Sequence, residues 1–540
     1  MDAELSTKRW PTTYAADGLV CSVDHLASSA GAALLGAGGT AADAAIAASA
    51  VLAVTTPHMC GMGGDLFALV HHRTGAPDAL NASGRAGSGA DPDRLRAEGH
   101  TEMPFKGDVR SAPMPGCVDG WCALHERHGR LPFADVLAPA IRLAEGGFPA
   151  APMLAFTLDR IRDVPGCDEL TSIRPAIGDR VLRPGVARQL RAVAEGGREA
   201  FYGGEFGERL LQAGGGEYSA DDLAWSSADW VDALGIAVWG HELWTVPPNS
   251  QGYLALAAAR IAELVAGPGA GGGLHLDGFP EPGSGEWAHL LVEASRLAGH
   301  DRVEQLHDRA DGEELLAPER LRALAARFDP HAVSGASAPG RGGGTIHLCA
   351  VDGDGMGVSL IQSNADAYGC HVAVPGTGIL LHSRGIGFSL EPGHPAEYGP
   401  GRRPPHTLAP ALATRADGSL RAVFGTMGGD SQPQVVLQLA ARLLVAAMEA
   451  GDVIQAPRFV LQAGPHGFST WNGEPQTVRL EQHAPGAWAT GLRERGHQVE
   501  VAGFDPAGFG HAHLIEIRDD GIRAGASDPR AMTGAAVASV

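Results

Sequence analysis

Lysine is almost absent from this chain. Among 540 residues only Lys8 and Lys106 are lysines. A Schiff-base mechanism and a Walker-type phosphate loop each need a lysine in a defined setting, and neither of these two lies in one. Those two kinds of site are therefore excluded. Any cationic contact to a substrate or an oxyanion must come from arginine, a helix end or backbone N–H groups.

Excess positive charge and long apolar runs are also missing. The formal net charge is -21, from 41 basic and 62 acidic residues, so the molecule as a whole repels phosphate backbones and anionic membranes. The longest apolar run, residues 41–54, contains Asp43 and Ser49, and the first ten residues contain no apolar segment. We therefore expect no nucleic-acid partner and no membrane span.

Paired cysteines and metal-ligand spacings are lacking as well. The seven cysteines are odd in number and form no C-x-x-C pair, which favours a reduced compartment and predicts a cytoplasmic protein. His511 and His513 form an H-A-H motif, but no carboxylate or cysteine joins them at ligand spacing. We expect them, like His58, His71 and His72, to be structural, and we predict no cofactor and no metal.

What is present is an alternation of helices and strands. Residues 39–54 are small and apolar behind an N-cap threonine, Thr40, and predict a buried helix. Residues 66–72 read as a buried strand. Further helices are expected from Trp121, at 132–147, from about Gly252, at 286–307 and at 442–451. The pattern predicts a mixed α and β protein.

The character of the sequence changes between Gly344 and Thr345. Residues 331–344, HAVSGASAPGRGGG, are of low complexity, and we expect them to be a mobile linker. Residues 345–363, TIHLCAVDGDGMGVSLIQS, alternate in hydrophobicity around a D-G-D-G turn and predict a β-hairpin.

A threonine that begins a strand directly after a glycine tract suggests self-cleavage. The Thr345 hydroxyl could attack the preceding carbonyl, form an ester and, after hydrolysis, become an N-terminal threonine. The freed amine has an ordinary pKa of roughly 8 and could act as general base. On local features alone the alternative, that Thr345 is simply the first residue of an edge strand, stays open.

Ten short runs resemble the gamma-glutamyltransferase family in order and approximate spacing, from about Ala30 to about Ala536. The runs are GGTAADAAIAASAVLAVTTPHMCGMGGD, PMPGCVDGW, LPFADVLAPAIRLAEGGFP, PPNSQG, TIHLCAVDGDGMGVSLIQS, PGTGILL, RRPPHTLAP, GTMGGDSQPQ, APRF and GASDPR. The resemblance implies an α+β fold, the four-layer αββα sandwich of the N-terminal-nucleophile hydrolases. It also implies a large subunit of residues 1–344 and a small subunit of residues 345–540, which together form one αββα domain.

The same resemblance assigns catalytic roles. Cleavage would fall between Gly344 and Thr345, and Thr345 would be the nucleophile. Ser363 stands where the family has a hydroxyl residue that hydrogen-bonds the amine of the nucleophile. Gly428 and Gly429 match the pair whose backbone N–H groups form the oxyanion hole. Cys349 lies four residues beyond Thr345 and should share its strand face, where a core role is expected.

The substrate-binding residues of the glutathione-handling members are not retained. Where those members have an asparagine, an aspartate, a serine pair and an early arginine, this chain has Ala365, Gly387, His406 with Thr407, and Ser83 with Arg85 two residues later. The variant pattern is similar to a cytoplasmic, acylase-like branch of the family. Candidate substrate-binding residues are then His406, Thr407, Asp430, Gln432, Gln434 and Arg85 or Arg403. Loop and helix-cap roles are equally open for them.

These features predict a self-cleaving amidohydrolase or acyltransferase that forms an acyl ester on Thr345 and passes the acyl group to water or an amine. Its partners would be a small-molecule amide or gamma-glutamyl substrate and the two subunits of one precursor, with a homo-oligomer left open. One alternative is a specialised acylase or biosynthetic hydrolase that acts on a non-gamma-glutamyl substrate, including a C–C bond next to a carbonyl. Another is a binding protein that never matures.

Overall fold

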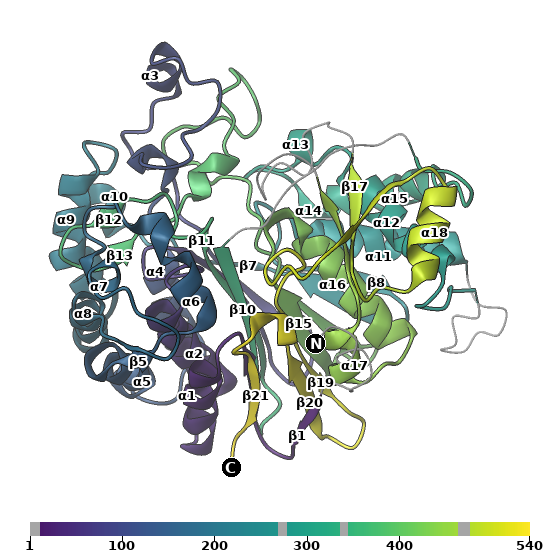
Figure 1. The fold of residues 1–540 in the computed structure, drawn as a ribbon, viewed down its shortest axis with the longest axis horizontal. Helices are drawn as coiled ribbons and strands as arrows, with labels where there is room; N and C mark the ends of the chain where they lie inside the picture. The colour runs from purple at the N-terminus through teal and green to yellow at the C-terminus, as the bar shows by residue number, and fades with distance from the viewer. Residues whose placement is uncertain (1–10, 268–277, 335–343, 463–475) are drawn as a thin grey trace.

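Two seven-stranded antiparallel sheets, stacked face to face and covered by helices, form the molecule (Figure 1). The computed structural model describes residues 11–267, 278–334, 344–462 and 476–540. The first sheet contains, in spatial order, β21 (Ala535–Ala538), β2 (Leu19–Ser22), β10 (Gly344–Val351), β11 (Gly357–Ala365), β3 (Asp65–His71), β4 (Asp78–Ala82) and β7 (Asp229–Asp232). The second contains β1 (Thr13–Ala15), β20 (Arg523–Ser527), β19 (Ala512–Ile517), β15 (Leu420–Thr426), β14 (Ala411–Arg415), β9 (His241–Thr245) and β8 (Leu234–Val238).

Three apolar cores hold the four layers together. Between the sheets, apolar side chains such as Phe67, Ile361 and Val423 interdigitate. The first sheet is covered by α1 (His25–Gly36), α2 (Ala41–Thr55), α4 (Cys117–His128), α5 (Phe133–Gly146) and α8 (Pro184–Tyr202). The second sheet is covered by α11 (Tyr253–Ala266), α12 (Gly285–Gly299) and α16 (Gln432–Ala440). The order helix, sheet, sheet, helix is the predicted αββα sandwich.

Smaller elements complete the fold. A three-stranded sheet contains β16 (Phe459–Gln462), β17 (Thr477–Glu481) and β18 (Gln498–Ala502), and short strand pairs form between β5 (Phe148–Pro149) and β6 (Arg180–Val181) and between β12 (Ala373–Val374) and β13 (Ile379–Leu380). The remaining helices are α3 (Pro92–Ala97), α6 (Pro152–Thr157), α7 (Asp168–Thr171), α9 (Glu205–Ala213), α10 (Ala220–Ala224), α13 (Arg302–Gln305), α14 (Gly312–Leu315), α15 (Pro318–Ala325), α17 (Ala450–Gln455) and α18 (Gly486–Glu494). Within the described ranges, no helix has both the length and the apolar character that a membrane span requires.

The helix α2 forms as its sequence predicts. Thr40 and Asp43 make a reciprocal capping box, in which each side chain accepts a hydrogen bond from the other residue's backbone N–H. Every residue of the helix is buried, because its small side chains let it lie between the first sheet and neighbouring helices. The expected hairpin is also present, as β10 and β11. The linker predicted to be mobile lies mostly outside the described residues.

Two predicted helices are wrong in extent. Residues 286–307 were expected as one helix, but α12 ends at Gly299 and α13 begins at Arg302. The chain breaks at Asp301, whose carboxylate receives two hydrogen bonds of 2.9 Å from Arg320. The second is the helix expected at 442–451, where the structure has no continuous helix.

In the second case tertiary contacts override helix propensity. A π-helical segment occupies Ala441–Val445, and Ala447 has a φ of 50°, which no right-handed helix accommodates. Arg442 lies 4.7 Å from the ring centroid of Trp287 and donates to the carbonyl of Pro457. These contacts fix the turn before α17.

Candidate active site

Three polar residues stand in one row across the first sheet. In the ladder between β10 and β11 Thr345 is opposite Ser363, and in the ladder between β11 and β3 Ser363 is opposite Asp65. Residues opposite one another in a sheet share a face, and neighbouring strands lie about 4.8 Å apart. All three side chains are buried. The row therefore places two hydroxyl groups and a carboxylate side by side at one end of the sheet.

The proposed cleavage site coincides with an irregularity in this ladder. The register shifts between Gly344 and Thr345, so the strand bulges at that bond. A Cβ atom on Gly344 would lie 2.9 Å from the carbonyl carbon of Asp366, so only glycine fits there. The predicted cleavage position is thus a tight bend in the chain.

The hydroxyl of Ser363 is the hub of the site. Its oxygen lies 2.8 Å from Thr345 Oγ1 and 2.7 Å from the carbonyl oxygen of Gly344. It also accepts from the backbone N–H of Ala365 at 2.8 Å and from Arg384 Nη2 at 3.0 Å. A hydroxyl accepts two hydrogen bonds and donates one. Because the two N–H donors fill both acceptor positions, the Ser363 proton points to Gly344 or to Thr345.

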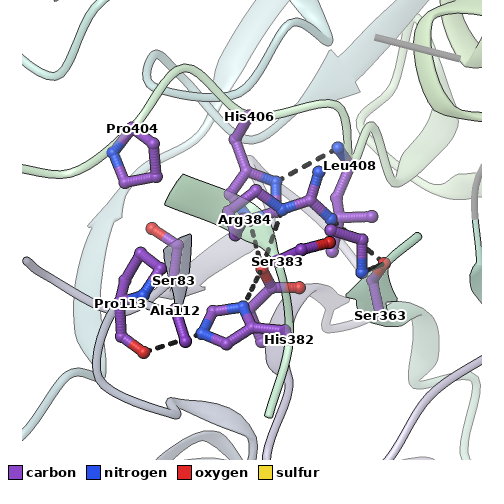
Figure 2. Close-up of polar contacts among 12 residues, drawn as sticks. Ser83, Ala112, Pro113, Ser363, His382, Ser383, Arg384, Pro404, His406 and Leu408 are labelled. Carbon is purple, nitrogen blue, oxygen red and sulfur yellow. Dashed lines mark hydrogen bonds and ion pairs between the residues drawn. The ribbon is translucent and has the colours of Figure 1, made fainter. Parts of the chain in front are cut away.

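Arg384, which the sequence analysis missed, links this hub to the rest of the site (Figure 2). Arg384 is 1% exposed, and Figure 2 draws the polar contacts around it. Besides the bond to Ser363, Nε donates to Asp65 Oδ2 at 2.9 Å and Nη1 donates to Thr407 Oγ1 at 2.7 Å. A buried guanidinium is costly unless it is paired and hydrogen-bonded, and here it is both. Its rigid fork fixes three side chains from separate strands and loops.

Asp65 is the counter-charge of this network, and the sequence analysis missed it too. Its Oδ2 accepts from Arg384, from His382 Nδ1 at 3.1 Å and from His406 Nε2 at 2.9 Å. Burial alone would raise the pKa of Asp65, but Arg384 and the two histidines outweigh burial and hold that pKa well below 3.8. Burial, helped by Arg384, lowers the pKa of His406 to about 3. At neutral pH the network therefore contains an ionised Asp65 and a neutral His406.

The predicted oxyanion glycines follow β15 and precede α16. Gly428 has a φ of 141° and Gly429 a φ of 59°, which side-chain-bearing residues seldom adopt. The carbonyl of Gly429 accepts from Gln251 Nε2 at 3.0 Å, and the same nitrogen donates to the carbonyl of Thr407 at 3.0 Å. A chain of hydrogen bonds thus runs from Thr345 to the glycine pair. Its intermediate members are Ser363, Arg384, Thr407 and Gln251.

Other predicted substrate-binding residues hold backbone segments in place. The carboxylate of Asp430 pairs with Arg302 at 3.3 Å. Gln432 Oε1 accepts from the backbone N–H of Ala409 at 3.0 Å, and Gln434 Oε1 accepts from that of Leu461 at 2.7 Å. The two glutamines therefore brace the chain around the glycine pair.

The two candidate arginines share one carboxylate. Arg85 Nη2 and Arg403 Nη1 each lie 2.9 Å from Asp229 Oδ2. Arg403 also donates to the carbonyl of Ser83 at 2.9 Å, and burial lowers its pKa to about 10. Within the described ranges, the side chain of Arg85 hydrogen-bonds Asp229 and the carbonyl of Gly401, not the residues around Thr345.

The residues expected to be structural differ in their surroundings. Cys349 packs among the apolar side chains between the sheets, and all seven cysteines are free. His513 is buried on β19, where burial lowers its pKa to about 3. His71 Nε2 lies 3.1 Å from the carbonyls of Gly75 and Gly418.

Weak sequence signals existed for the missed residues. Asp65 is an acidic residue at the start of an otherwise apolar strand, directly after the GMGG turn. Arg384 and His382 stand in a short loop, HSRG, behind an apolar run. Gln251 lies in PPNSQG, one of the runs that carry the family resemblance. Polar residues in such apolar surroundings tend to be buried and paired.

Comparisons with known proteins agree with this geometry. The gamma-glutamyltranspeptidase family model matches residues 27–538. A glutathione hydrolase-like YwrD proenzyme of Bacillus subtilis is 35% identical, over 96% of this chain and 98% of that protein. An oxamate amidohydrolase proenzyme of Klebsiella pneumoniae is 34% identical, over 96% and 98%. The crystal structure of cephalosporin acylase from Bacillus halodurans superposes with a TM-score of 0.87 at 33% identity, covering 98% of this chain and 97% of that one. The chain therefore belongs to the gamma-glutamyltranspeptidase family and is an enzyme of the amidohydrolase or acyltransferase type.

Proposed function

We propose that this chain is a precursor that cleaves itself between Gly344 and Thr345 and then hydrolyses amides through an acyl ester on Thr345. The observation that carries the proposal is the position of Ser363, within hydrogen-bond distance of both the Thr345 hydroxyl and the Gly344 carbonyl. The proenzyme names of the two curated relatives add support. Seven free cysteines fit a reduced compartment such as the cytoplasm.

Strand order supports the association of the two proposed subunits after cleavage. In the first sheet, β10 and β11 lie between β2 and β3. Apart from Gly344, β10 and β11 belong to the proposed small subunit, whereas β2 and β3 belong to the large one. In the second sheet β14 pairs with β9 of the large subunit, and β20 pairs with β1. Both sheets would have to come apart before the fragments could separate.

In the cleavage step Thr345 Oγ1 attacks the carbonyl carbon of Gly344. Donation from the Ser363 hydroxyl, 2.7 Å from that carbonyl oxygen, stabilises the negative charge that develops on it. The C–N bond breaks, the threonine nitrogen takes up the proton lost by the hydroxyl, and an ester joins the two residues. Water then hydrolyses the ester, leaving a carboxylate on Gly344 and a free amine on Thr345.

In the hydrolytic reaction the free amine of Thr345 is the general base, with an ordinary pKa of roughly 8. The hydroxyl attacks the substrate carbonyl, and its proton passes through the amine to the departing nitrogen. Backbone N–H groups of Gly428 and Gly429 would bind the oxyanion. Water then attacks the acyl ester, which regenerates the hydroxyl and releases the carboxylic acid.

We infer that the acyl group is not gamma-glutamyl. Position 365 is an alanine, and position 387 has no room for a side chain, because a Cβ on Gly387 would lie 2.5 Å from the carbonyl oxygen of Pro405. The charged groups near Thr345 are instead Arg384 and Asp65, which are paired with one another. Each missing charge-assisted bond to an amino-acid headgroup removes roughly 1.5–3 kcal/mol of binding. The names of the oxamate amidohydrolase and the cephalosporin acylase are in line with such a substrate.

Denaturing gel electrophoresis with N-terminal sequencing tests self-cleavage. We expect two fragments in the wild-type enzyme, the smaller beginning TIHLC, and two in Thr345→Ser, the smaller beginning SIHLC. Thr345→Ala should give one intact band. An active sample in which Gly344 and Thr345 remain joined would overturn the proposal. One intact, inactive band in the wild type would instead favour the binding protein that never matures.

A substrate panel tests specificity separately. Cleaved enzyme is assayed with a gamma-glutamyl anilide, oxamate, glutaryl amides and N-acyl amino acids. We expect a member other than the anilide to have the highest kcat/KM. Preference for the anilide would contradict the inference drawn from Ala365 and Gly387 while leaving the self-cleavage proposal intact.

A further inference from the structure

A second polar cluster lies at the far end of β3. His72 directly follows that strand, Asp78 begins β4, and His128 is the last residue of α4. His72 Nε2 is 3.1 Å from His128 Nδ1 and 3.8 Å from Asp78 Oδ2. His128 Nε2 is 3.3 Å from the same carboxylate oxygen. One nitrogen or oxygen from each residue lies within 4.8 Å of the others.

The nitrogen at the centre of this cluster lacks a hydrogen bond. His128 is 7% exposed, and its Nε2 makes no hydrogen bond to any described residue although Asp78 is near. Imidazole binds metals in its neutral state, through a ring nitrogen that carries no proton.

The surroundings orient the three side chains as ligands. Arg127 donates to Asp78 Oδ1 at 2.9 Å, which leaves Oδ2 facing the histidines. The Trp230 ring packs edge-on against His128, with 5.1 Å between the ring centroids. The Arg127 guanidinium lies over the same Trp230 ring, 4.5 Å from its centroid. Second-shell contacts of this kind fix ligating rings and carboxylates. The His72 side chain is 51% exposed, so an ion can enter from solvent.

We propose that His72, Asp78 and His128 bind a Zn²⁺ ion, with water completing a tetrahedral shell. Ligands about 2.0–2.1 Å from such an ion stand about 3.4 Å apart, close to the 3.3 and 3.8 Å that separate His128 Nε2 and His72 Nε2 from Asp78 Oδ2. Coordination of His72 Nε2 to the ion would replace its present hydrogen bond to His128 Nδ1. Two imidazoles with one carboxylate suit zinc, whereas Mg²⁺ and Ca²⁺ prefer oxygen ligands throughout.

The ion would lie too far from Thr345 to take part in amide hydrolysis. His72 lies seven residues along the chain from Asp65, so it is about 23 Å from the catalytic row at 3.3 Å per residue. The ion would link the β3–β4 hairpin to the end of α4. It should therefore raise thermal stability and leave amide hydrolysis unchanged.

Zinc titration of chelator-treated wild-type enzyme tests the site. By calorimetry we expect one tightly bound Zn²⁺ per chain and, by thermal unfolding, a rise in Tm that Mg²⁺ does not produce. His72→Ala removes an exposed ligand without opening the core, and zinc affinity should fall by about 100-fold or more, since even second-shell changes cost about 10- to 100-fold. His72→Cys retains a ligand and should restore most of the affinity.

His331→Ala, which removes an exposed histidine elsewhere, is the matched control and should bind zinc as the wild type does. Absence of zinc binding in the wild type, or equal zinc affinity in wild type and His72→Ala, would overturn the proposal. Loss of hydrolysis on zinc removal, reversed by adding zinc back, would overturn the structural role assigned to the ion.

Discussion

Replacement of Arg384 by glutamine is the sharpest test of the catalytic network. Glutamine is shorter and neutral, so it cannot reach Asp65, Thr407 and Ser363 together. Ser363 then loses one of the two N–H donors that fill its acceptor positions and hold its proton toward Gly344 and Thr345. The freed hydroxyl can rotate so that its proton no longer points to the Gly344 carbonyl. Loss of one charge-assisted hydrogen bond costs about 1.5–3 kcal/mol. If this free energy is added to the activation barrier, self-cleavage slows about 10- to 150-fold.

The same substitution destabilises the fold for a separate reason. Asp65 would keep its two histidine donors but lose the cation that balances its buried charge. Removing one partner of a buried ion pair costs about 3–5 kcal/mol. In the double variant Asp65→Asn/Arg384→Gln no charge is left uncompensated, so much of the stability should return while cleavage remains slow.

Rates and stability must therefore be measured on the same proteins. Precursor cleavage is followed on denaturing gels, and unfolding is followed in urea. Arg402→Gln is the control, since Arg402 pairs with Asp308 away from Thr345 and its loss should leave cleavage unchanged. A folded Arg384→Gln protein that cleaves at the wild-type rate would refute the argument. Recovery of the rate in the double variant would reduce Arg384 to a structural residue.

Two further outcomes follow from the site and the core. Gly428→Ala would place a Cβ atom 2.4 Å from Ser431 Oγ, in a backbone conformation with a φ of 141°. The backbone must then shift and move an oxyanion donor, so kcat should fall by about 100- to 1,000-fold. An unchanged kcat would exclude Gly428 from the oxyanion hole. Acid should destabilise the fold below pH 6.5, because His406 and His513, with pKa values of about 3, stay neutral when folded and gain protons when unfolded. Each histidine lowers the free energy of unfolding by about 1.4 kcal/mol per pH unit in this range. A urea midpoint that stays constant from pH 6.5 to pH 5 would contradict this prediction.

The sequence predicts those elements whose signals are local. Helix α2 follows from a capping box and a run of small residues, and the β10–β11 hairpin follows from alternation around a turn. The helices expected at 286–307 and 442–451 were wrong because their limits depend on distant partners. Asp301 meets Arg320, and Arg442 meets Trp287, contacts that no local pattern reveals.

The active-site residues also differ in whether a local sequence pattern indicates them. Thr345 and Ser363 lie in one hairpin, so a single run of residues indicates both. Asp65 and Arg384 come from segments more than 300 residues apart, and only the register of β3 against β11 brings the carboxylate into the row. Family resemblance did not find this pair either, since it transfers only the roles that the family's own motifs carry.

The absence of a side chain at position 387 is related to the packing of the network around Asp65. Gly387 ends the turn that begins with Arg384, and the carbonyl of Pro405, next to His406, occupies the space that a side chain at position 387 would need. Both ends of that turn thus pack against the segment that carries His406 and Thr407, two members of the network around Asp65. A carboxylate restored at position 387 would displace this segment and the network with it. We therefore expect Gly387→Asp alone to displace this segment and not to create activity on a gamma-glutamyl anilide, because the turn and the segment pack together.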